Sequence, residues 1–116
     1  MNIHQWDIFR VPVKEGIDAN IVHPHVVIQD DTITQSRIET VVVCALSTNM
    51  KRENDFWNIL LDPGEANLPK HSIIIVSQVS TVQKSELWEY IGTLSKERID
   101  QIFSEMKLIQ NMSKKD

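Results

Sequence analysis

Apolar residues at helical spacing mark the end of this chain, and this limits the folds that the sequence can adopt. From residue 96 to about residue 111, apolar side chains recur every three or four positions. They form one stripe, which consists of Ile99, Ile102, Phe103, Met106 and Ile109. Ser95 precedes this stretch and can cap the N-terminus of a helix. We therefore expect one helix over residues 96–111, with its stripe packed on a sheet formed by the rest of the chain.

The segments before this helix have the pattern of short strands separated by polar breaks. Alternating or β-branched apolar residues predict strands over residues 6–12, 24–29, 38–47, 56–61, 72–79 and 88–94. Polar residues predict loops over 14–22 and 48–55, a break at residues 30–32 and a turn at residues 62–65. The third strand is apolar on both faces, which indicates packing on each side. Strands followed by one late helix predict a mainly β (α+β) fold, a small β-barrel.

The composition is that of one soluble domain spanning residues 1–116. Of the 116 residues, 41% are apolar and 24% are charged, as in an ordinary globular protein. The single cysteine, Cys44, excludes an intrachain disulfide framework and a multi-cysteine zinc site. Apolar runs are too short to span a membrane, so we expect a cytoplasmic protein without membrane contact. The net charge of −4 argues against binding duplex DNA through bulk charge, but it permits local contacts to a short single strand.

Two histidines at the start of the second strand are the first candidates for chemistry. In His23-Pro24-His25 the imidazoles lie two positions apart, so they share a face of an extended strand. They could bind a metal, one could act as an acid or base near neutral pH, or both could be exposed strand-end residues. Because a clear third ligand is missing from the sequence, we expect neither a metal site nor another cofactor.

Polar and aromatic residues near other strand ends are weaker candidates. Ser47-Thr48-Asn49 closes the third strand, and its hydroxyl groups could contact phosphate oxygens. Lys51-Arg52 and Lys70-His71 could also meet a phosphate, although such pairs are typical of solvated loops. The aromatic residues that could stack on bases are Trp6, Phe56, Trp57 and Trp88. Aromatic residues in strands lie more often in a core or an interface, so these residue types alone indicate only a β-rich domain with a weak His/Ser site.

The order of the segments resembles the MazF/PemK toxins of bacterial toxin–antitoxin systems. Residues 6–11 look like the family's first strand, and residues 23–31 match its second strand, which begins with Arg-Pro, except for the arginine. Residues 41–49 look like the family strand that ends in Ile-Thr. Residues 72–84 resemble its fifth-strand motif, and Ile91-Gly92-Thr93-Leu94-Ser95 is close to its Ile-Gly-Xaa-Leu-Ser ending. The resemblance spans residues 5 to 110.

This resemblance implies both a fold and an activity. The fold would be an SH3-like β-barrel that forms a homodimer. The activity would be that of a metal-independent endoribonuclease, which cuts single-stranded RNA at short sequences. In the mechanism attributed to the family, an arginine and a threonine assist the attack of the ribose 2′-hydroxyl on the neighbouring phosphate. The partner implied is an antitoxin protein whose extended segment covers the RNA groove.

The chain departs from the family pattern at the two positions that carry this chemistry. His23 replaces the arginine and Ser47 replaces the threonine, with Thr48 beside it. Histidine transfers protons more readily than arginine, and serine keeps the hydroxyl group. We therefore expect His23 to act as acid or base and Ser47 to contact the phosphate. The residues expected to bind RNA are His25, Thr48, Asn49, Lys51, Arg52, Gln78 and Thr81.

The replacement of arginines leaves two other interpretations open. The arginine and the acid of the fifth-strand motif are Ser80 and Ser77 here, so the site has less positive charge than the family pattern. A catalytically weak or inactive barrel could bind only nucleic acid or an antitoxin-like peptide, or the barrel could be purely structural. Another protein surface would have to cover the apolar side chains of Trp57, Trp88 and the third strand, which is apolar on both faces. This also predicts a dimer.

Overall fold

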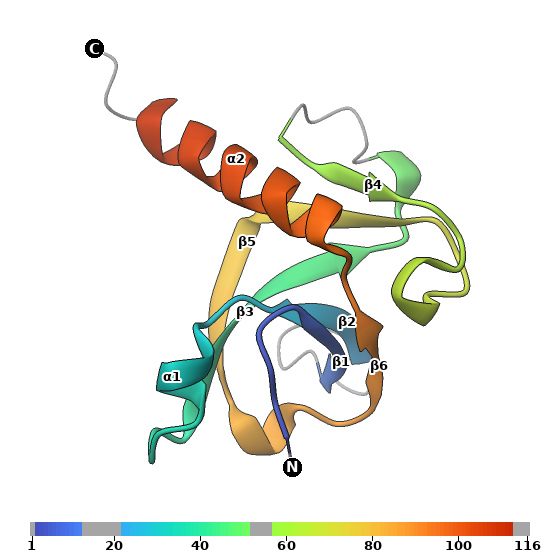
Figure 1. Ribbon diagram of the computed structural model, residues 1–116. Helices are drawn as coiled ribbons and strands as arrows, with labels where there is room; N and C mark the ends of the chain where they lie inside the picture. The colour runs from blue at the N-terminus through green and yellow to red at the C-terminus, as the bar shows by residue number, and fades with distance from the viewer. Residues whose placement is uncertain (1, 13–21, 52–56, 113–116) are drawn as a thin grey trace.

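The computed structural model describes residues 2–12, 22–51 and 57–112, which form one antiparallel sheet with a helix across it (Figure 1). Within these residues the sheet has six strands in the order β4-β5-β3-β2-β1-β6. The strands are β1 (Asp7–Pro12), β2 (Val22–Val27), β3 (Thr40–Ser47), β4 (Ile59–Leu61), β5 (Ser72–Gln83) and β6 (Tyr90–Thr93). The helices are α1 (Asp31–Thr34) and α2 (Lys96–Met112), and 3-10 turns occur at η2 (Glu65–Asn67) and η3 (Lys84–Glu86). This arrangement confirms the prediction of a mainly β, barrel-like sheet followed by a C-terminal helix.

Several element boundaries differ from the sequence prediction. The fifth strand continues to Gln83, because backbone pairing with β3, such as Val41 with Val82, extends it although its second half is largely exposed. The predicted break after the second strand is the short helix α1, whose N-cap Asp30 accepts a hydrogen bond from the Thr32 amide at 2.8 Å. β4 begins only at Ile59, and Phe56, the predicted start, lies outside the described residues.

Apolar side chains cover both faces of the sheet. On the face that α2 crosses, the buried cluster includes Ile8, Val26 and Cys44. Their neighbours Phe9, Val27 and Val43 belong to a second cluster on the other face, which is the hollow side of the curled sheet. The prediction that β3 packs on both sides is therefore correct. Its packing partners lie in the same chain, so β3 needs no second protomer to cover it.

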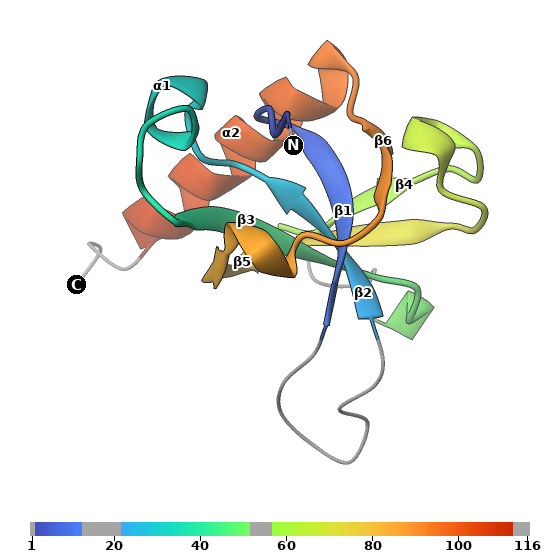
Figure 2. The same cartoon turned by 90° about the horizontal axis from the view of Figure 1, so that it is seen from below.

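The helix α2 packs on the sheet through a narrower stripe than the sequence predicts. Figure 2 shows α2 along one side of the sheet, where Ile102 is fully buried against the first cluster. Phe103 is 55% exposed, and only the edge of its ring system meets Trp6, with centroids 5.2 Å apart. The predicted helix start is correct, since the Ser95 hydroxyl accepts from the Arg98 amide at 3.4 Å. Among the described residues, no helix combines the length and the apolar character needed to cross a membrane.

Close packing explains why position 92, near the end of the chain, is a glycine. It lies in β6 against η2, and a Cβ at this position would lie 2.1 Å from the carbonyl oxygen of Ala66. That contact is with backbone, which cannot rotate away as a flexible side chain can. The Ile-Gly-Xaa-Leu-Ser segment therefore allows β6 and η2 to approach closely.

Arg98 connects α2 to the turn before β5. Its guanidinium group donates to both carboxylate oxygens of Glu65, at 2.9 and 2.6 Å, and the Asp62 amide donates to the same carboxylate at 3.0 Å. The two charged side chains are only 19% and 26% exposed. The hydrogen bond from Arg98 is the main reason that the pKa of Glu65 is lowered. This bidentate pair fixes the start of α2 on the sheet.

Replacing Arg98 with alanine is expected to lower the free energy of unfolding by about 1–3 kcal/mol, because Glu65 loses its charged donor. A carboxylate with a lowered pKa stabilises the fold above its unfolded pKa, and this contribution disappears as the pH falls through the folded pKa. The difference between wild type and Arg98→Ala should therefore shrink on acidification. Urea unfolding of both proteins at neutral and acidic pH measures it. The exposed Lys96→Ala is the control, and equal losses in both variants would contradict the role of the pair.

Candidate functional site

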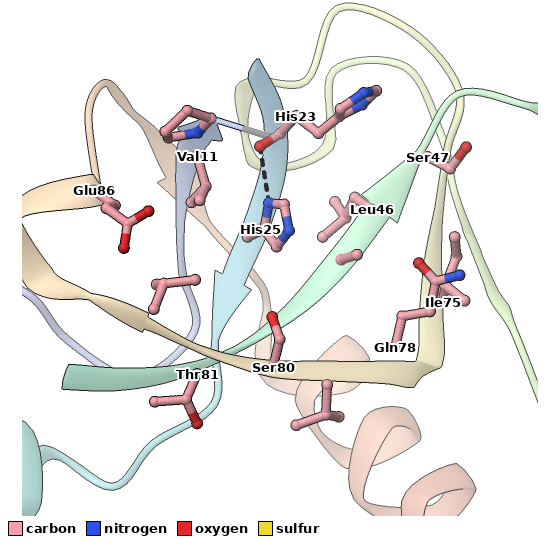
Figure 3. A pocket seen from close by; sticks show the side chains of 14 residues that line it. Val11, His23, His25, Leu46, Ser47, Ile75, Gln78, Ser80, Thr81 and Glu86 are labelled. Atoms are coloured by element: carbon pink, nitrogen blue, oxygen red, sulfur yellow. Dashed lines mark hydrogen bonds between the residues drawn. The ribbon is translucent and has the colours of Figure 1, made fainter. Parts of the chain in front are cut away.

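A groove on the hollow side of the sheet contains most of the chemistry predicted from the sequence. Its volume is about 720 Å³, and residues of β1, β2, β3, β5 and η3 line it (Figure 3). The predicted site residues that line it are His23, His25, Ser47, Gln78 and Thr81. They come from three strands that are not consecutive in the sequence, so the curvature of the sheet brings them together.

The groove owes its shape to a bend in β5, which is visible beside α2 in Figure 1. Cys44 pairs with Val79, but Leu46 pairs with Ile74, so β5 carries more residues than β3 between these pairs. The extra residues disrupt the ladder and turn the strand, as in a β-bulge. Gln78 lies in this bend and lines the groove. The sequence shows no glycine or proline there, which explains why the bend was not predicted.

His23 and Ser47 lie on the same side of the sheet and at the same end of the groove. β2 and β3 are antiparallel, with His25 opposite Ala45 and Val26 opposite Cys44. The pairing ends at His25 and Ala45, and extending its register by two residues would place His23 opposite Ser47. Both residues line the groove.

His25 stands inside the groove, whereas His23 is exposed at its rim (Figure 3). The Nδ1 atom of His25 lies 2.9 Å from the carbonyl oxygen of His23. Burial is the main cause of a lowered pKa at His25; the hydrogen bond with His23 opposes this shift, and the His23 ring adds to it. The half-buried ring therefore favours its neutral form more than an exposed histidine does.

Ser47 has its hydroxyl oxygen already oriented by the backbone. This oxygen accepts a hydrogen bond from the Asn49 amide at 3.0 Å. Because a hydroxyl group can accept and donate at once, the Ser47 proton remains able to point to another acceptor. A phosphate oxygen in the groove would be such an acceptor.

The other predicted contacts that the structure describes lie outside the groove. Thr48 lines a second, smaller cavity of about 310 Å³, which also contains His23, Arg10 and Lys70. Asn49 and Lys51 line neither cavity, and the Asn49 side chain instead accepts from the Lys51 amide at 3.2 Å. Arg52 lies outside the described residues, so its predicted role is not addressed by the structure.

The groove has little permanent positive charge. Among the residues that the structure describes, its titratable lining groups are His23, His25 and Glu86, and no lysine or arginine lines it. Sequence reasoning missed Glu86, whose carboxylate accepts from the Gln83 amide at 2.9 Å and caps η3. The Gln-x-x-Glu spacing of a capping box was the available signal. Ser80 also lines the groove, where the family resemblance has an arginine.

Several alternative chemistries receive no support from the described residues. No group of three or more His, Cys, Asp or Glu side chains could hold a metal ion there. Burial raises the pKa of the Cys44 thiol to about 12, and the thiol donates to the Ile75 carbonyl at 3.2 Å, so Cys44 is a packing residue.

The candidate aromatic platforms that the structure describes do not line the groove. Trp6 is only 9% exposed and belongs to the core, which is the position that the sequence analysis favours for an aromatic residue in a strand. Trp88 is 58% exposed and Trp57 is half-buried, but neither lines either cavity. Phe56 lies outside the described residues. Base stacking in the groove would therefore need other side chains.

Comparison with known proteins identifies relatives of this chain. A family model described as PemK-like, MazF-like toxin of type II toxin–antitoxin system matches residues 4–110. The endoribonucleases MazF2 of Mycobacterium bovis and MazF6 of Mycobacterium tuberculosis are each 29% identical over 69 residues. This stretch covers 60% of the present chain and 60% of each relative.

Solved structures share the fold at lower sequence identity. An endoribonuclease from a mycobacterial species, solved in complex with its cognate antitoxin, superposes with a TM-score of 0.78 at 15% identity. The superposition covers 95% of this chain and 96% of that chain. A MazE–MazF structure from Deinococcus radiodurans gives a TM-score of 0.71 at 8% identity, with 92% and 93% coverage. At these identities the similarity establishes the fold.

Proposed function

The chain belongs to the family of PemK-like and MazF-like toxins of type II toxin–antitoxin systems, and on this premise we propose that it is an endoribonuclease. Its substrate would be single-stranded RNA, cut at short sequences without a metal ion. The observation that carries this proposal is that His23 and Ser47, at the positions where the family resemblance has its reactive arginine and threonine, both line the groove. The names of the curated relatives, which are endoribonucleases, support it.

The proposed reaction is an attack by the ribose 2′-hydroxyl on the adjacent phosphate. A base removes the hydroxyl proton, the new bond forms a 2′,3′-cyclic phosphate, and the bond to the 5′-oxygen breaks. An acid protonates that leaving oxygen, which yields a 5′-hydroxyl end. Imidazole can serve in either proton transfer near neutral pH, which makes His23 a suitable acid or base. The Ser47 proton and, from the adjoining cavity, Thr48 donate to the phosphate oxygens.

Other polar residues would hold the RNA strand. Gln78 and Thr81 line the groove beside the histidines and can accept or donate hydrogen bonds to bases and sugars. Arg10 and Lys70 lie with Thr48 in the second cavity, next to His23, and can supply positive charge to the flanking phosphates. Arg10 also pairs with Glu89 at 3.3 Å, so RNA would compete for it.

The proposal includes the cellular partners implied by a toxin of this family. We place the protein in the cytoplasm as a homodimer, bound by an antitoxin protein that blocks the groove. The exposed Trp88 and Tyr90 side chains support a protein interface on the β6 edge. The complex of a mycobacterial endoribonuclease with its antitoxin supports the same kind of partner here.

Cleavage of a long unstructured RNA tests the proposed function. Wild-type protein in EDTA is expected to give fragments with 2′,3′-cyclic phosphate and 5′-hydroxyl ends. A 2′-deoxy substitution at a mapped cleavage position should abolish cutting there, because it removes the nucleophile. The His23→Ala/Ser47→Ala double variant, purified in the same way, controls for contaminating ribonuclease. Equal cleavage by wild type and double variant, or continued cutting at the deoxy position, would overturn the proposal.

A catalytically inactive RNA-binding barrel is the second candidate. The lack of lysine and arginine among the described residues of the groove favours it. In that case the protein would bind RNA in a salt-sensitive manner and release it uncut. The same assay, read on a native gel, separates the two candidates.

A further inference from the structure

We propose that His25 is the general base that removes the proton from the ribose 2′-hydroxyl, and that His23 protonates the leaving oxygen. This assignment rests on the proposed ribonuclease function and deepens it. The sequence placed His25 only among the RNA-binding residues and left His23 to act as either acid or base. The geometry of the groove separates the two roles.

The first argument is position. His25 lies between β1 and β3 in the middle of the sheet, paired with Phe9 on one side and Ala45 on the other. Ala45 has only a methyl group, so the imidazole has room to stand above it in the groove. Figure 3 shows the His25 ring inside the groove and the His23 ring extending beyond the rim. An RNA strand in the groove would therefore meet His25 on its buried side and His23 at its solvent side.

The second argument is the direction of the ring nitrogens. The carbonyl oxygen of His23 can only accept a hydrogen bond, so the Nδ1 atom of His25 must be the donor across their 2.9 Å separation. In the neutral ring this leaves the proton on Nδ1 and an unprotonated lone pair on Nε2. The backbone of the neighbouring residue thus selects the tautomer and orients the ring. Nε2 is then ready to accept a proton from a hydroxyl group.

The third argument is the charge around the ring. Burial lowers the pKa of His25, the hydrogen bond to the His23 carbonyl opposes this shift, and the nearby His23 ring lowers the pKa further, so the His25 ring favours its neutral form. Within the described residues, β1, β3 and β5 contribute only uncharged side chains to the groove. From η3, Glu86 faces the groove, but its carboxylate is engaged with the Gln83 amide. The surroundings of His25 therefore favour a neutral ring that can accept a proton.

The proton balance of the step closes with these two residues. Nε2 of His25 takes the 2′-hydroxyl proton while the 2′-oxygen bonds to phosphorus. The bond from phosphorus to the 5′-oxygen breaks, and the His23 imidazolium gives that oxygen a proton. His25 ends protonated and His23 neutral, and exchange with water restores both. No metal or redox partner is consumed.

A substrate with a reactive leaving group tests the assignment. In RNA with a bridging 5′-phosphorothiolate, the leaving sulfur needs no protonation, so an acid becomes dispensable but a base does not. On ordinary RNA, His25→Gln and His23→Gln should each cleave about 10²–10⁴-fold more slowly than wild type. On the thiolate substrate, His23→Gln should recover to near the wild-type rate and His25→Gln should stay slow. Recovery of His25→Gln instead would overturn the assignment.

The pH profile and the ring tautomer give independent readouts. In wild type, kcat/KM should fall on the acidic side of its pH profile at a pH below the usual histidine pKa, because the base must be unprotonated. This fall should be absent in His25→Gln. Nitrogen NMR should find the neutral His25 ring protonated on Nδ1, and a proton on Nε2 would contradict the proposal without any activity measurement. An unchanged profile in His25→Gln would overturn the base role and leave the ribonuclease function intact. If wild type does not cleave RNA, the proposed function fails and the assignment fails with it.

Discussion

Replacing His23 with alanine is expected to slow cleavage of single-stranded RNA by about 10²–10⁴-fold, with a small change in KM. The exposed His23 ring lies at the rim of the groove that Ser47 also lines, and in the proposed mechanism it gives a proton to the leaving oxygen. Alanine removes that proton and leaves the sheet unchanged, because the side chain contributes little to packing. Single-turnover cleavage of a short RNA containing one mapped site measures the effect.

Two further variants separate proton transfer from charge. His23→Arg restores the positive charge of the family pattern, but arginine holds its proton too tightly for transfer near neutral pH. We expect RNA affinity to rise while the cleavage rate falls, because the proton donor is lost. Ser47→Thr keeps the hydroxyl and should retain activity, whereas Ser47→Ala should lose about 10²–10³-fold if the hydroxyl stabilises the phosphate in the transition state. Full activity in both His23→Ala and Ser47→Ala would show that neither side chain takes part in cleavage, and this would contradict the prediction.

Replacing Phe9 with alanine is expected to lower the free energy of unfolding by about 3–5 kcal/mol. Phe9 is 2% exposed and belongs to the cluster beneath the groove, together with Val11, Val27 and Leu87. Its ring also meets Tyr90 in an edge-on contact, with centroids 5.7 Å apart. Truncation leaves a cavity beside His25, because Phe9 is the residue that pairs with His25 across β1 and β2. Thermal and urea unfolding measure the loss.

Phe103 provides a matched control for this prediction. The same truncation on α2 removes a ring that is 55% exposed, so we expect Phe103→Ala to cost less than about 1 kcal/mol. Since both variants remove the same atoms, the difference between them reports mainly burial, with a smaller contribution from the preference of alanine for a helix over a strand. Similar losses in the two variants would mean that the hollow face of the sheet is not packed as described.

Much of the secondary structure could be predicted because its causes are local. The stripe from Ile99 to Ile109 and the Ser95 cap predict α2 correctly, since helix spacing and capping act within a few residues. Only residues 80–83 at the end of β5 were missed, because their side chains are largely exposed and their pairing with β3 is a long-range contact. Phe103 belongs to the stripe by spacing, but the width of the contact with the sheet leaves it exposed.

The candidate site also has features that the sequence predicts and features that depend on tertiary contacts. The residue types at positions 23 and 47 are visible in the sequence, and the segments around them resemble a family motif that points to RNA chemistry, although these two positions depart from it. Whether they face each other depends on the register of β2 and β3, which tertiary pairing sets. The sequence also did not show which residues supply positive charge next to the groove. Lys51 lines neither cavity, whereas Arg10 and Lys70 line the second cavity together with Thr48.

The sequence by itself determined the fold class and the late helix, because these depend on spacing and residue type. Only the tertiary structure distinguished the two histidines to which the proposal gives different roles. In the sequence, His23 and His25 are the same residue type on the same face of one strand. In the curved sheet, the His25 ring is half-buried and the His23 ring is exposed. The carbonyl of His23 then orients the buried ring of His25. Burial and hydrogen-bond direction are properties of the folded chain, and they make one imidazole suited to accept a proton and the other to donate one.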